Sequence, residues 1–260
     1  MSGPGLKGYN AVVTGGGRGI GAAAAIALAE AGAKVSVAAR NETQVVEIAA
    51  RIRKDGHEAF AFRCDVTEPH QVRDLALSAT EAMGRIDILV NNAGTATSNP
   101  LSRITIAEWQ HIMDVNATGT FLCSQAVYDA MVERRWGRIV NVASIAGIEG
   151  DKYISAYTAA KHAVVGFTRA MAVESKGTGV TFNAVCPGYV DTPLTDETIA
   201  RIMHQTGRSW QESLSALLKQ ADQPRLIRAH EVAEAIVELC LEEAGSRNGE
   251  LVVLDGSETP

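Results

Sequence analysis

Short apolar runs of strand length recur along the whole chain, with longer segments of helical spacing between them. The runs are rich in Val and Ile and lie at Ala11–Thr14, Val35–Ala38, Ala59–Phe62, Ile88–Val90, Ile139–Val142, Thr181–Val185 and Leu251–Leu254. Strands that are apolar throughout need cover on both faces, as in parallel sheets with helical crossovers. Because such crossovers are right-handed, the pattern predicts a doubly wound α/β fold, with a parallel sheet of about seven strands and helices on both faces.

Segments with apolar residues at helical spacing connect these runs. The expected helices are Ala22–Ala31, Thr43–Lys54, Pro69–Met83, Ile106–Glu133, Ile154–Lys176 and Glu231–Glu243. Asn41 is placed to cap the second helix, with Gln44 three residues on. A length of 260 residues with 46% hydrophobic residues suits one α/β domain with a sizeable core, so residues 1–260 are expected to form a single domain.

The regular alternation breaks once, between Thr192 and His230. This insert contains two helical fragments, Asp196–Gln205 and Gln211–Gln220, and ends near Pro224. It follows the end of a strand, where ligands bind in open α/β sheets. We therefore expect a substrate lid over about residues 192–225; a surface excursion or an oligomer contact is the alternative.

Charge and composition exclude several classes of function. The formal net charge is −6, and a chain without a basic stripe is not expected to bind nucleic acid. The four cysteines are far apart, so we expect buried free thiols in a reducing compartment and no metal site. They are Cys64, Cys123, Cys186 and Cys240. The start of the chain has no signal pattern, and the longest apolar stretch, Ala22–Ala29, is too short to span a bilayer, so a soluble cytoplasmic protein without membrane contact is expected.

A glycine-rich loop follows the first expected strand and opens the first expected helix. It contains Gly15, Gly17, Arg18, Gly19, Ile20 and Gly21. Glycines allow a tight turn and a close approach of backbone to a diphosphate, and the helix N-terminus presents free N–H groups to that anion. The position after a strand and before a helix is that of a dinucleotide site in a Rossmann fold. A tight structural turn is the alternative.

Further motifs follow in a fixed order along the chain. They are Asn91-Asn92-Ala93-Gly94 after a strand, Asn116 within a helix, Ser144, the pair Tyr157 and Lys161, and Pro187-Gly188 with Thr192. Together with the glycine loop, this set resembles the short-chain dehydrogenase/reductase family along almost the whole chain. The resemblance implies an NAD(P)(H)-dependent oxidoreductase that interconverts a ketone and a secondary alcohol by hydride transfer.

Tyr157 and Lys161 are the expected centre of the chemistry. They are four residues apart on an expected helix and so share one face. A tyrosine has an ordinary pKa near 10, and a nearby ammonium is expected to lower it toward the range of an acid/base catalyst. The resemblance implies that Ser144 holds the substrate oxygen, that Lys161 also binds the nicotinamide ribose, and that Asn116 supports a proton relay. His162 points to another face and is expected to be packed or capping rather than a base.

The end of the second expected strand bears on the choice of cofactor. Ala39 stands where an acidic residue would select NAD, and Arg40 can accommodate the 2′-phosphate of NADP. Arg18 could also face a phosphate. We favour NADP(H), with NAD(H) possible through other contacts. The resemblance implies further cofactor contacts from Asp65, Val66, Asn91, Ala93, Gly94, Tyr157, Lys161, Pro187, Gly188, Val190 and Thr192, although Asp65-Val66 could instead be a turn cap.

The expected substrate pocket is mostly apolar. Its edges are taken to be Thr95, Ala96, Ala146, Ile148, Ile154, Tyr189, Leu194, Met203 and Trp210. The chain resembles 3-oxoacyl and polyketide ketoreductases and bacterial 3-hydroxybutyrate dehydrogenases, but Ala96, Ala146 and Ile154 replace polar groups that grip a small carboxylate in the latter. We expect a hydrophobic ketone or a 3-oxoacyl thioester.

Two other functions stay open at this point, and one assembly is implied. A non-catalytic nucleotide-binding sensor or scaffold is the alternative to an enzyme, although Asn116, Ser144, Tyr157 and Lys161 are all retained. A nucleotide-sugar epimerase needs a larger C-terminal domain than this chain has room for. The ending Gly249–Gly256 resembles the last strand of the family, which often lies in a subunit contact, so a homotetramer is expected.

Overall fold

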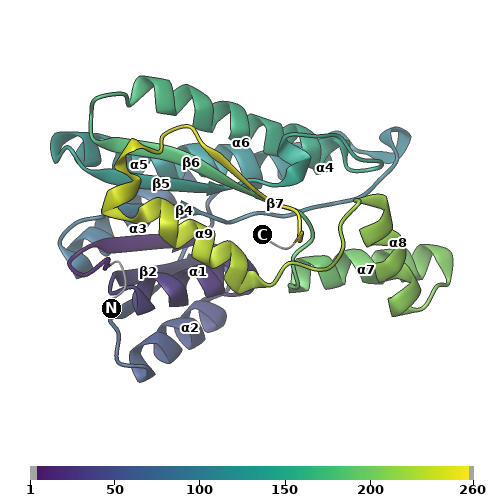
Figure 1. The fold of residues 1–260 in the computed structure, drawn as a ribbon, viewed down its shortest axis with the longest axis horizontal. Helices are drawn as coiled ribbons and strands as arrows, with labels where there is room; N and C mark the ends of the chain where they lie inside the picture. The colour runs from purple at the N-terminus through teal and green to yellow at the C-terminus, as the bar shows by residue number, and fades with distance from the viewer. Residues whose placement is uncertain (1–4, 258–260) are drawn as a thin grey trace.

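Seven parallel strands form one sheet in the computed structural model, which describes residues 5–257 (Figure 1). The strands are β1 (Asn10–Thr14), β2 (Lys34–Ala39), β3 (Ala59–Arg63), β4 (Ile88–Asn91), β5 (Gly137–Val142), β6 (Val180–Pro187) and β7 (Leu251–Leu254). Their order in the sheet is β3-β2-β1-β4-β5-β6-β7, and every ladder is parallel. The doubly wound fold predicted from the alternating pattern is confirmed, with each strand within a few residues of its expected bounds.

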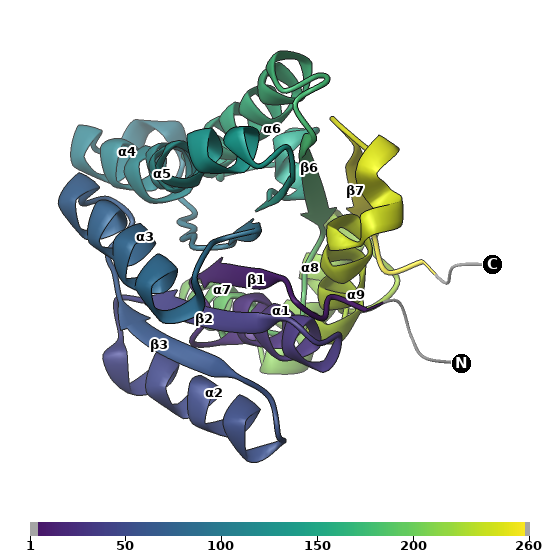
Figure 2. The same ribbon diagram turned by 90° about the vertical axis from the view of Figure 1, so that its left-hand side faces the viewer.

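Helices cover both faces of this sheet (Figure 2). They are α1 (Gly19–Glu30), α2 (Glu42–Lys54), α3 (Pro69–Met83), α4 (Ile106–Met113), α5 (Gly119–Glu133), α6 (Ser155–Glu174), α7 (Pro193–Thr206), α8 (Trp210–Gln220) and α9 (Ala229–Cys240). Helices α1, α2 and α9 pack in one core cluster, while α3 and α5 pack in a second cluster on the other face. Asn41 caps α2 as expected, since its Oδ1 accepts a hydrogen bond from Gln44 N at 3.3 Å.

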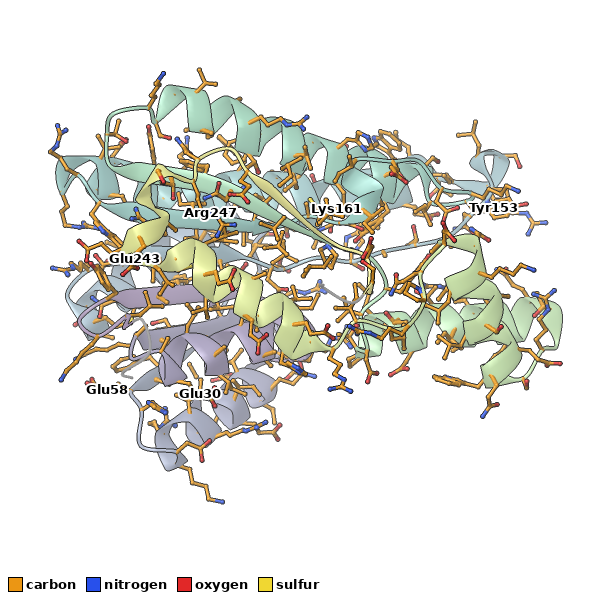
Figure 3. The ribbon with its side chains drawn as sticks, in the orientation of Figure 1. Glu30, Glu58, Tyr153, Lys161, Glu243 and Arg247 are labelled. Atoms are coloured by element: carbon orange, nitrogen blue, oxygen red, sulfur yellow. The ribbon has the colours of Figure 1, made fainter. Side chains whose placement is uncertain are left out.

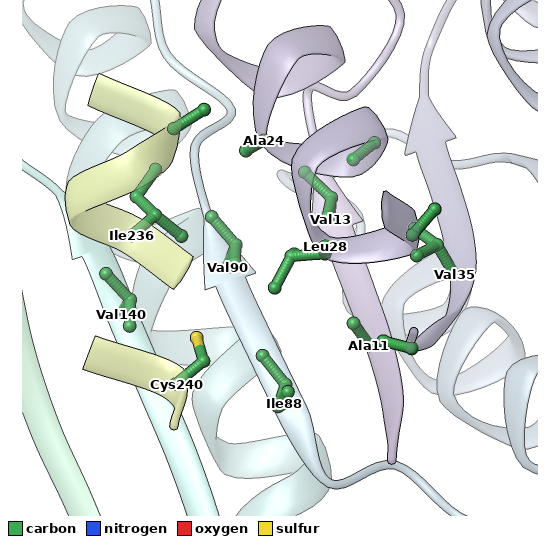
Figure 4. Close-up of a cluster of buried hydrophobic side chains, with 14 of the residues drawn as sticks. Ala11, Val13, Ala24, Leu28, Val35, Ile88, Val90, Val140, Ile236 and Cys240 are labelled. Carbon is green, nitrogen blue, oxygen red and sulfur yellow. The ribbon is translucent and has the colours of Figure 1, made fainter. Parts of the chain in front are cut away.

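The two core clusters follow from the period-two geometry of the strands. In β1, Ala11 and Val13 face the first cluster and Val12 faces the second. Figure 4 shows Leu28 of α1 lying among the side chains of β1 and β4, with Ile236 of α9 nearby. All residues of β1 are buried, which explains why its sequence is apolar without alternation.

The prediction of one continuous helix over Ile106–Glu133 was wrong. The segment Ile106–Glu133 is divided into α4 and α5 by a π-helical segment, Asp114–Thr118. The physical reason is the side chain of Asn116, whose Nδ2 donates to Ile112 O at 2.9 Å. In an α-helix, the backbone N–H of Asn116 would donate to this same carbonyl. Because the Asn116 side chain donates to it instead, the helical turn widens at this point.

The insert after β6 forms two helices at one end of the molecule (Figure 1). Both expected fragments are helical, but α7 begins three residues earlier than predicted because Pro193 occupies its first turn. Helix α8 begins with a capping box formed by Ser209 and Glu212. Within the described residues 5–257, no helix is long and apolar enough to cross a membrane.

Truncation of Leu28 tests how much the first core cluster contributes to stability. Leu28 is fully buried, and Leu28→Ala is expected to lower the free energy of unfolding by about 2–5 kcal/mol, because it leaves a cavity between α1 and the sheet. Urea denaturation followed by circular dichroism measures the change. Leu77→Ala is the matched control, since Leu77 on α3 is 70% exposed and its loss should cost less than about 0.5 kcal/mol. Equal losses in both variants would contradict this description of the core.

Candidate active site

The glycine-rich loop joins β1 to α1 at the carboxyl edge of the sheet. Gly15 and Gly19 adopt φ angles of +61° and +55°, which favour glycine. Gly21 has no room for a Cβ, because that atom would overlap Gly15 O and the amide of Asn92. The Asn92 Nδ2 donates to Thr14 O and Gly15 O, at 3.1 Å each, and so holds the loop against the end of β4.

A groove runs along this loop and fits an extended anionic ligand such as a dinucleotide. Within residues 5–257, no side chain caps the N-terminus of α1, so its first N–H groups are free to meet an anion. The groove brings together most of the residues predicted to bind the cofactor. These are Gly15, Gly17, Arg18, Gly19, Ile20, Arg40, Asp65, Val66, Ala93, Gly94 and Thr192.

Of the residues predicted to bind the cofactor, Gly21 and Asn91 line neither this groove nor the cavity beside it. Gly21 acts through packing, as described above. Asn91 is buried, and its Nδ2 donates to Ser124 Oγ and Asn141 Oδ1 at 2.9 Å each, so it ties β4 to β5 and α5. Sequence reasoning had instead passed over its neighbour Asn92, which lines the groove. Because successive strand residues point to opposite faces, only one of the two asparagines reaches the groove.

Both arginines of the groove have carboxylate neighbours. Arg40 Nη1 lies 3.9 Å from Asp65 Oδ2, and the Arg40 side chain is 62% exposed. Arg18 Nη1 donates to Glu197 Oε1 of α7 at 2.9 Å, so this ion pair joins the glycine loop to the insert. Arg18, which we expected to face a phosphate, therefore has a protein partner in this structure.

A second cavity adjoins the groove and contains all four predicted catalytic residues, Asn116, Ser144, Tyr157 and Lys161. It also contains Pro187, Gly188 and Val190. The groove and the cavity share the residues Ile20, Asn92, Gly94, Thr192 and Leu194. A ligand extending from the groove therefore reaches the cavity directly.

Different elements hold the catalytic candidates. Ser144 follows β5 and caps a short 3-10 turn, with its Oγ accepting from Ala146 N at 3.1 Å. The same Oγ lies 3.4 Å from Pro187 O, at the end of β6. Asn116 is fixed by the π-helical segment, and its Nδ2 donates to Thr95 O at 2.9 Å. The end of the sheet and the widened helical turn thus present these groups to one space.

Tyr157 and Lys161 share one face of α6, as their spacing predicts. Lys161 Nζ lies 5.7 Å from the centre of the Tyr157 ring and donates to Val142 O at 2.8 Å. Lys161 is buried, and Figure 3 labels it near the ends of the strands. Gly94 makes room for this arrangement, since a Cβ there would lie 2.9 Å from Asn116 Oδ1 and 3.6 Å from Lys161 Nζ.

Burial governs the acid–base state of both residues. It raises the pKa of Tyr157 to about 12, although the hydroxyl of Ser144 opposes this rise. The expected lowering of the Tyr157 pKa by Lys161 is therefore wrong for the chain alone, because loss of solvation outweighs the distant ammonium. Burial also lowers the pKa of Lys161 to about 8. The phenol is thus a protonated donor at neutral pH, beside a lysine that is close to titrating.

The outer part of the cavity differs in part from the predicted pocket. Thr95, Ala96, Ala146, Ile154, Tyr189 and Leu194 line it, whereas Ile148, Met203 and Trp210 do not. Helix α7 faces the cavity through Leu194, Thr195, Thr198 and Arg201, at spacings of one, three and three residues. Met203, two residues further, points elsewhere. Ile148 and Trp210 are each 39% exposed.

Several polar residues of the cavity were not foreseen from the sequence. They are Thr97, Glu149, Asp151, Thr198, Arg201 and Asp222. They come from the loop after β4, the loop after the 3-10 turn and the insert, where no motif marks them. His162 is exposed, and its Nδ1 lies 3.0 Å from Thr158 O, so the expectation that this side chain is packed was wrong. His162 does not line the cavity, which agrees with the expectation that it is not the base.

The cysteines behave as the spacing predicts. All four are free, buried thiols. Among residues 5–257, no cluster of three or more His, Cys, Asp or Glu side chains could hold a metal ion.

The chain is similar to known proteins over most of its length. A family model described as short chain dehydrogenase matches residues 9–202. A 3-oxoacyl-(acyl-carrier-protein) reductase of Vibrio cholerae is 38% identical over 253 residues, which cover 96% of this chain and 97% of the relative. A granaticin polyketide synthase putative ketoacyl reductase of Streptomyces violaceoruber is 34% identical over 242 residues, which cover 91% and 88%.

Solved structures agree with this similarity. An actinorhodin polyketide ketoreductase variant crystallised with NADPH superposes with a TM-score of 0.91 at 34% identity, covering 95% of this chain and 96% of the other. A levodione reductase gives a TM-score of 0.91 at 32% identity, covering 96% and 97%.

The pH dependence of stability tests the burial of Lys161. An unfolded lysine titrates near 10.5 and the buried one at about 8, so between these values the unfolded chain binds more protons and the contribution of Lys161 to stability rises with pH. From pH 7.5 to pH 10, the free energy of unfolding of the wild type should increase relative to that of Lys161→Met by about 2 kcal/mol. Urea titrations at each pH measure this difference.

Lys176→Met is the matched control, because Lys176 is exposed at the end of α6. Its difference from the wild type should stay flat over the same range. A Lys161→Met difference that is equally flat would mean that the Lys161 ammonium is well solvated in the folded protein.

Proposed function

Because the chain belongs to the short-chain dehydrogenase family, we propose that Tyr157 is the acid/base of its reaction. The chain is an NAD(P)-dependent oxidoreductase that interconverts a ketone and an alcohol. The observation that carries the proposal is the meeting of Ser144, Tyr157 and Lys161 in one cavity that opens into the dinucleotide groove.

The residues around the groove would hold the cofactor. The glycine loop and the N-terminus of α1 suit the diphosphate, and Asp65-Val66, which line the same groove, would hold the adenosine end. Lys161, Pro187 and Gly188 line the cavity with the catalytic group and would hold the nicotinamide end. When bound, the reduced nicotinamide supplies a hydride to the carbonyl carbon of the substrate.

The protein residues then handle the oxygen and the proton. The Ser144 hydroxyl donates a hydrogen bond to the substrate carbonyl, and the Tyr157 phenol donates its proton to the oxygen as that oxygen becomes an alkoxide. The Lys161 ammonium favours the phenolate that remains. We propose that Asn116 supports the proton relay that returns a proton to Tyr157 and Lys161. Asn116 and Lys161 both border Gly94, so their side chains lie close to one another.

Removal of the phenol tests this role. Tyr157→Phe should lower kcat/KM by roughly 10²- to 10⁴-fold, the usual contribution of general acid–base catalysis, because the substitution removes the proposed proton donor to the substrate oxygen. Absorbance of NADPH during reduction of a ketone panel gives the rates, and fluorescence titration should show unchanged cofactor binding. Tyr153→Phe is the control, since Tyr153 is 60% exposed and lies at the outer edge of the molecule (Figure 3). A rate that survives in Tyr157→Phe would remove Tyr157 from the mechanism.

We propose NADP(H) as the preferred cofactor. Ala39 offers no carboxylate to a ribose 2′-hydroxyl, and Arg40 beside it lines the groove with an exposed guanidinium. Arg18 lines the same groove and could turn from Glu197 to a phosphate, since this ion pair is half exposed on both sides. One of the solved relatives was crystallised with NADPH.

Substitution of Arg40 tests which of the two cofactors the protein prefers. Arg40→Ala should weaken NADPH binding by about 10-fold, the effect expected for one charged hydrogen bond, and leave NADH binding unchanged. Titration of each reduced cofactor by its fluorescence measures both constants. Arg51→Ala, an exposed arginine at the far end of α2, should change neither. Tighter binding of NADH than NADPH to the wild type would overturn this preference.

We propose that the substrate is a hydrophobic ketone or a 3-oxoacyl thioester. The cavity next to Ser144 and Tyr157 has an apolar wall formed by Ala146, Ile154 and Leu194. The Vibrio relative is named for a 3-oxoacyl substrate and the granaticin relative for a ketoacyl one. Residues 192–225 would act as the lid of this cavity, because α7 lines it on one side.

The assembly and the location of the protein remain expectations. A homotetramer is expected from the family resemblance, and Val253 of β7, at 50% exposure, leaves an apolar side chain on the strand that would meet another subunit. A cytoplasmic location likewise stays a prediction.

A further inference from the structure

One arginine in the substrate cavity has unsatisfied hydrogen-bonding capacity. Arg201 of α7 donates from Nη2 to Thr198 Oγ1 at 2.9 Å. Its Nε is buried and has no hydrogen-bond partner among residues 5–257. No ion pair in the same part of the chain joins Arg201 to a carboxylate.

Other arginines of comparable exposure are paired. Arg225 binds Glu231 through two hydrogen bonds of 2.8 and 2.7 Å, and Arg247 binds Glu250 in the same way. A buried donor without an acceptor costs free energy, so such groups in folded proteins normally find a partner. An arginine that stays charged and faces a cavity is therefore a candidate for binding an anionic ligand.

The position of Arg201 defines where such a ligand group would lie. Helix α7 begins beside the groove, where Leu194 lines both the groove and the cavity. Arg201 follows Leu194 by seven residues, which corresponds to about 10 Å along the helix axis. The same cavity is lined by the apolar side chains of Ala146 and Ile154. The cavity thus combines the catalytic candidates, an apolar wall and one cationic side chain.

We propose that Arg201 binds a carboxylate of the substrate, so that the ketone reduced by this enzyme carries a carboxylate beyond an apolar spacer. This inference rests on the proposed function and narrows its substrate class. Thr198 holds the guanidinium at Nη2. A planar guanidinium without a carboxylate partner in the protein can donate two parallel hydrogen bonds to the oxygens of a ligand carboxylate. A spacer is required because Arg201 lies about two helical turns beyond Leu194, the residue of α7 that borders both the groove and the cavity.

Three acids in the same cavity limit the charge of the ligand. Glu149 and Asp222 are exposed, and Asp151 accepts hydrogen bonds from Gln220 and from its neighbour Lys152. These carboxylates of the same cavity repel each further anionic group that a ligand carries. One carboxylate therefore suits the cavity better than the several phosphates of a coenzyme A thioester.

Paired substrates test the proposal. The probes are phenyl ketones whose carboxylate is separated from the carbonyl by three to seven methylene groups, each with its methyl ester. For at least one length, the wild type should prefer the acid over the ester by roughly 10- to 100-fold in kcat/KM, as expected for one charged pair. Arg201→Gln should abolish this preference, mainly through KM, and leave ester reduction within about twofold. Arg201→Lys should restore part of it.

Arg208→Gln is the matched control, because Arg208 lies just past α7, is exposed, and does not line the cavity. It should keep the full preference for the acid. Binding of the acids to the cofactor-loaded protein, measured by calorimetry, provides a readout that does not depend on turnover. Thermal melting checks that each variant is folded.

The outcomes separate this inference from the proposed function. A wild type that reduces or binds the ester as well as the acid at every spacer length overturns the role of Arg201. The same holds if Arg201→Gln keeps the preference for the acid. If Arg201→Gln instead impairs only coenzyme A thioesters, the residue binds a phosphate and the carboxylate class is wrong. If no ketone is reduced but the acids still bind through Arg201, the proposed reaction fails and the anion site stands.

Discussion

The strand order of the sheet reverses between β1 and β4, and this reversal creates the crevice on which every functional feature of the protein depends. The chain leaves β1 toward α1 on one face and leaves β4 toward the other, so the two loops separate at the carboxyl edge. Asn92, directly after β4, bridges the opening by donating to Thr14 O and Gly15 O. The groove and the cavity both lie in this crevice and share Asn92 as a lining residue.

The same crevice places a lysine where it is poorly solvated. Lys161 is 4% exposed, and burial lowers its pKa to about 8. A buried ammonium at neutral pH lowers stability, which is a common cost at catalytic sites. The cost is offset in part by the hydrogen bond to Val142 O and by the packing of α6 against α4, where Ile112 contacts Ala156 and Ala160.

The fold could be predicted from the sequence because burial of a parallel sheet on both faces constrains many residues at once. Strands buried on both faces, the proline that opens α3 and the glycine loop are each visible in short windows. Features that depend on a single side-chain hydrogen bond, or on burial in the assembled fold, were not visible. The π-helical segment arises because Asn116 takes the carbonyl of Ile112, which no apolar period reveals. The raised pKa of Tyr157 reflects burial by elements distant in sequence.

The wall that α7 forms in the substrate cavity could also not be predicted from the sequence in detail. Which residues of α7 face the cavity depends on where the helix begins, and Pro193 sets that start three residues before the predicted one. The expected Met203 thus points away, and Arg201, which no motif marks, lines the cavity.

The first turns of α7 link the two parts of the site. Pro193 and Leu194 border the groove, Leu194 also borders the cavity, and Glu197 forms the ion pair with Arg18 of the glycine loop. Both partners of that pair are about half exposed, so it contributes at most about 1 kcal/mol. A contact of this strength holds α7 near the glycine loop without fixing it there. Because α7 lines both spaces, the Arg18–Glu197 ion pair joins the glycine loop of the groove to the helix that forms one wall of the cavity.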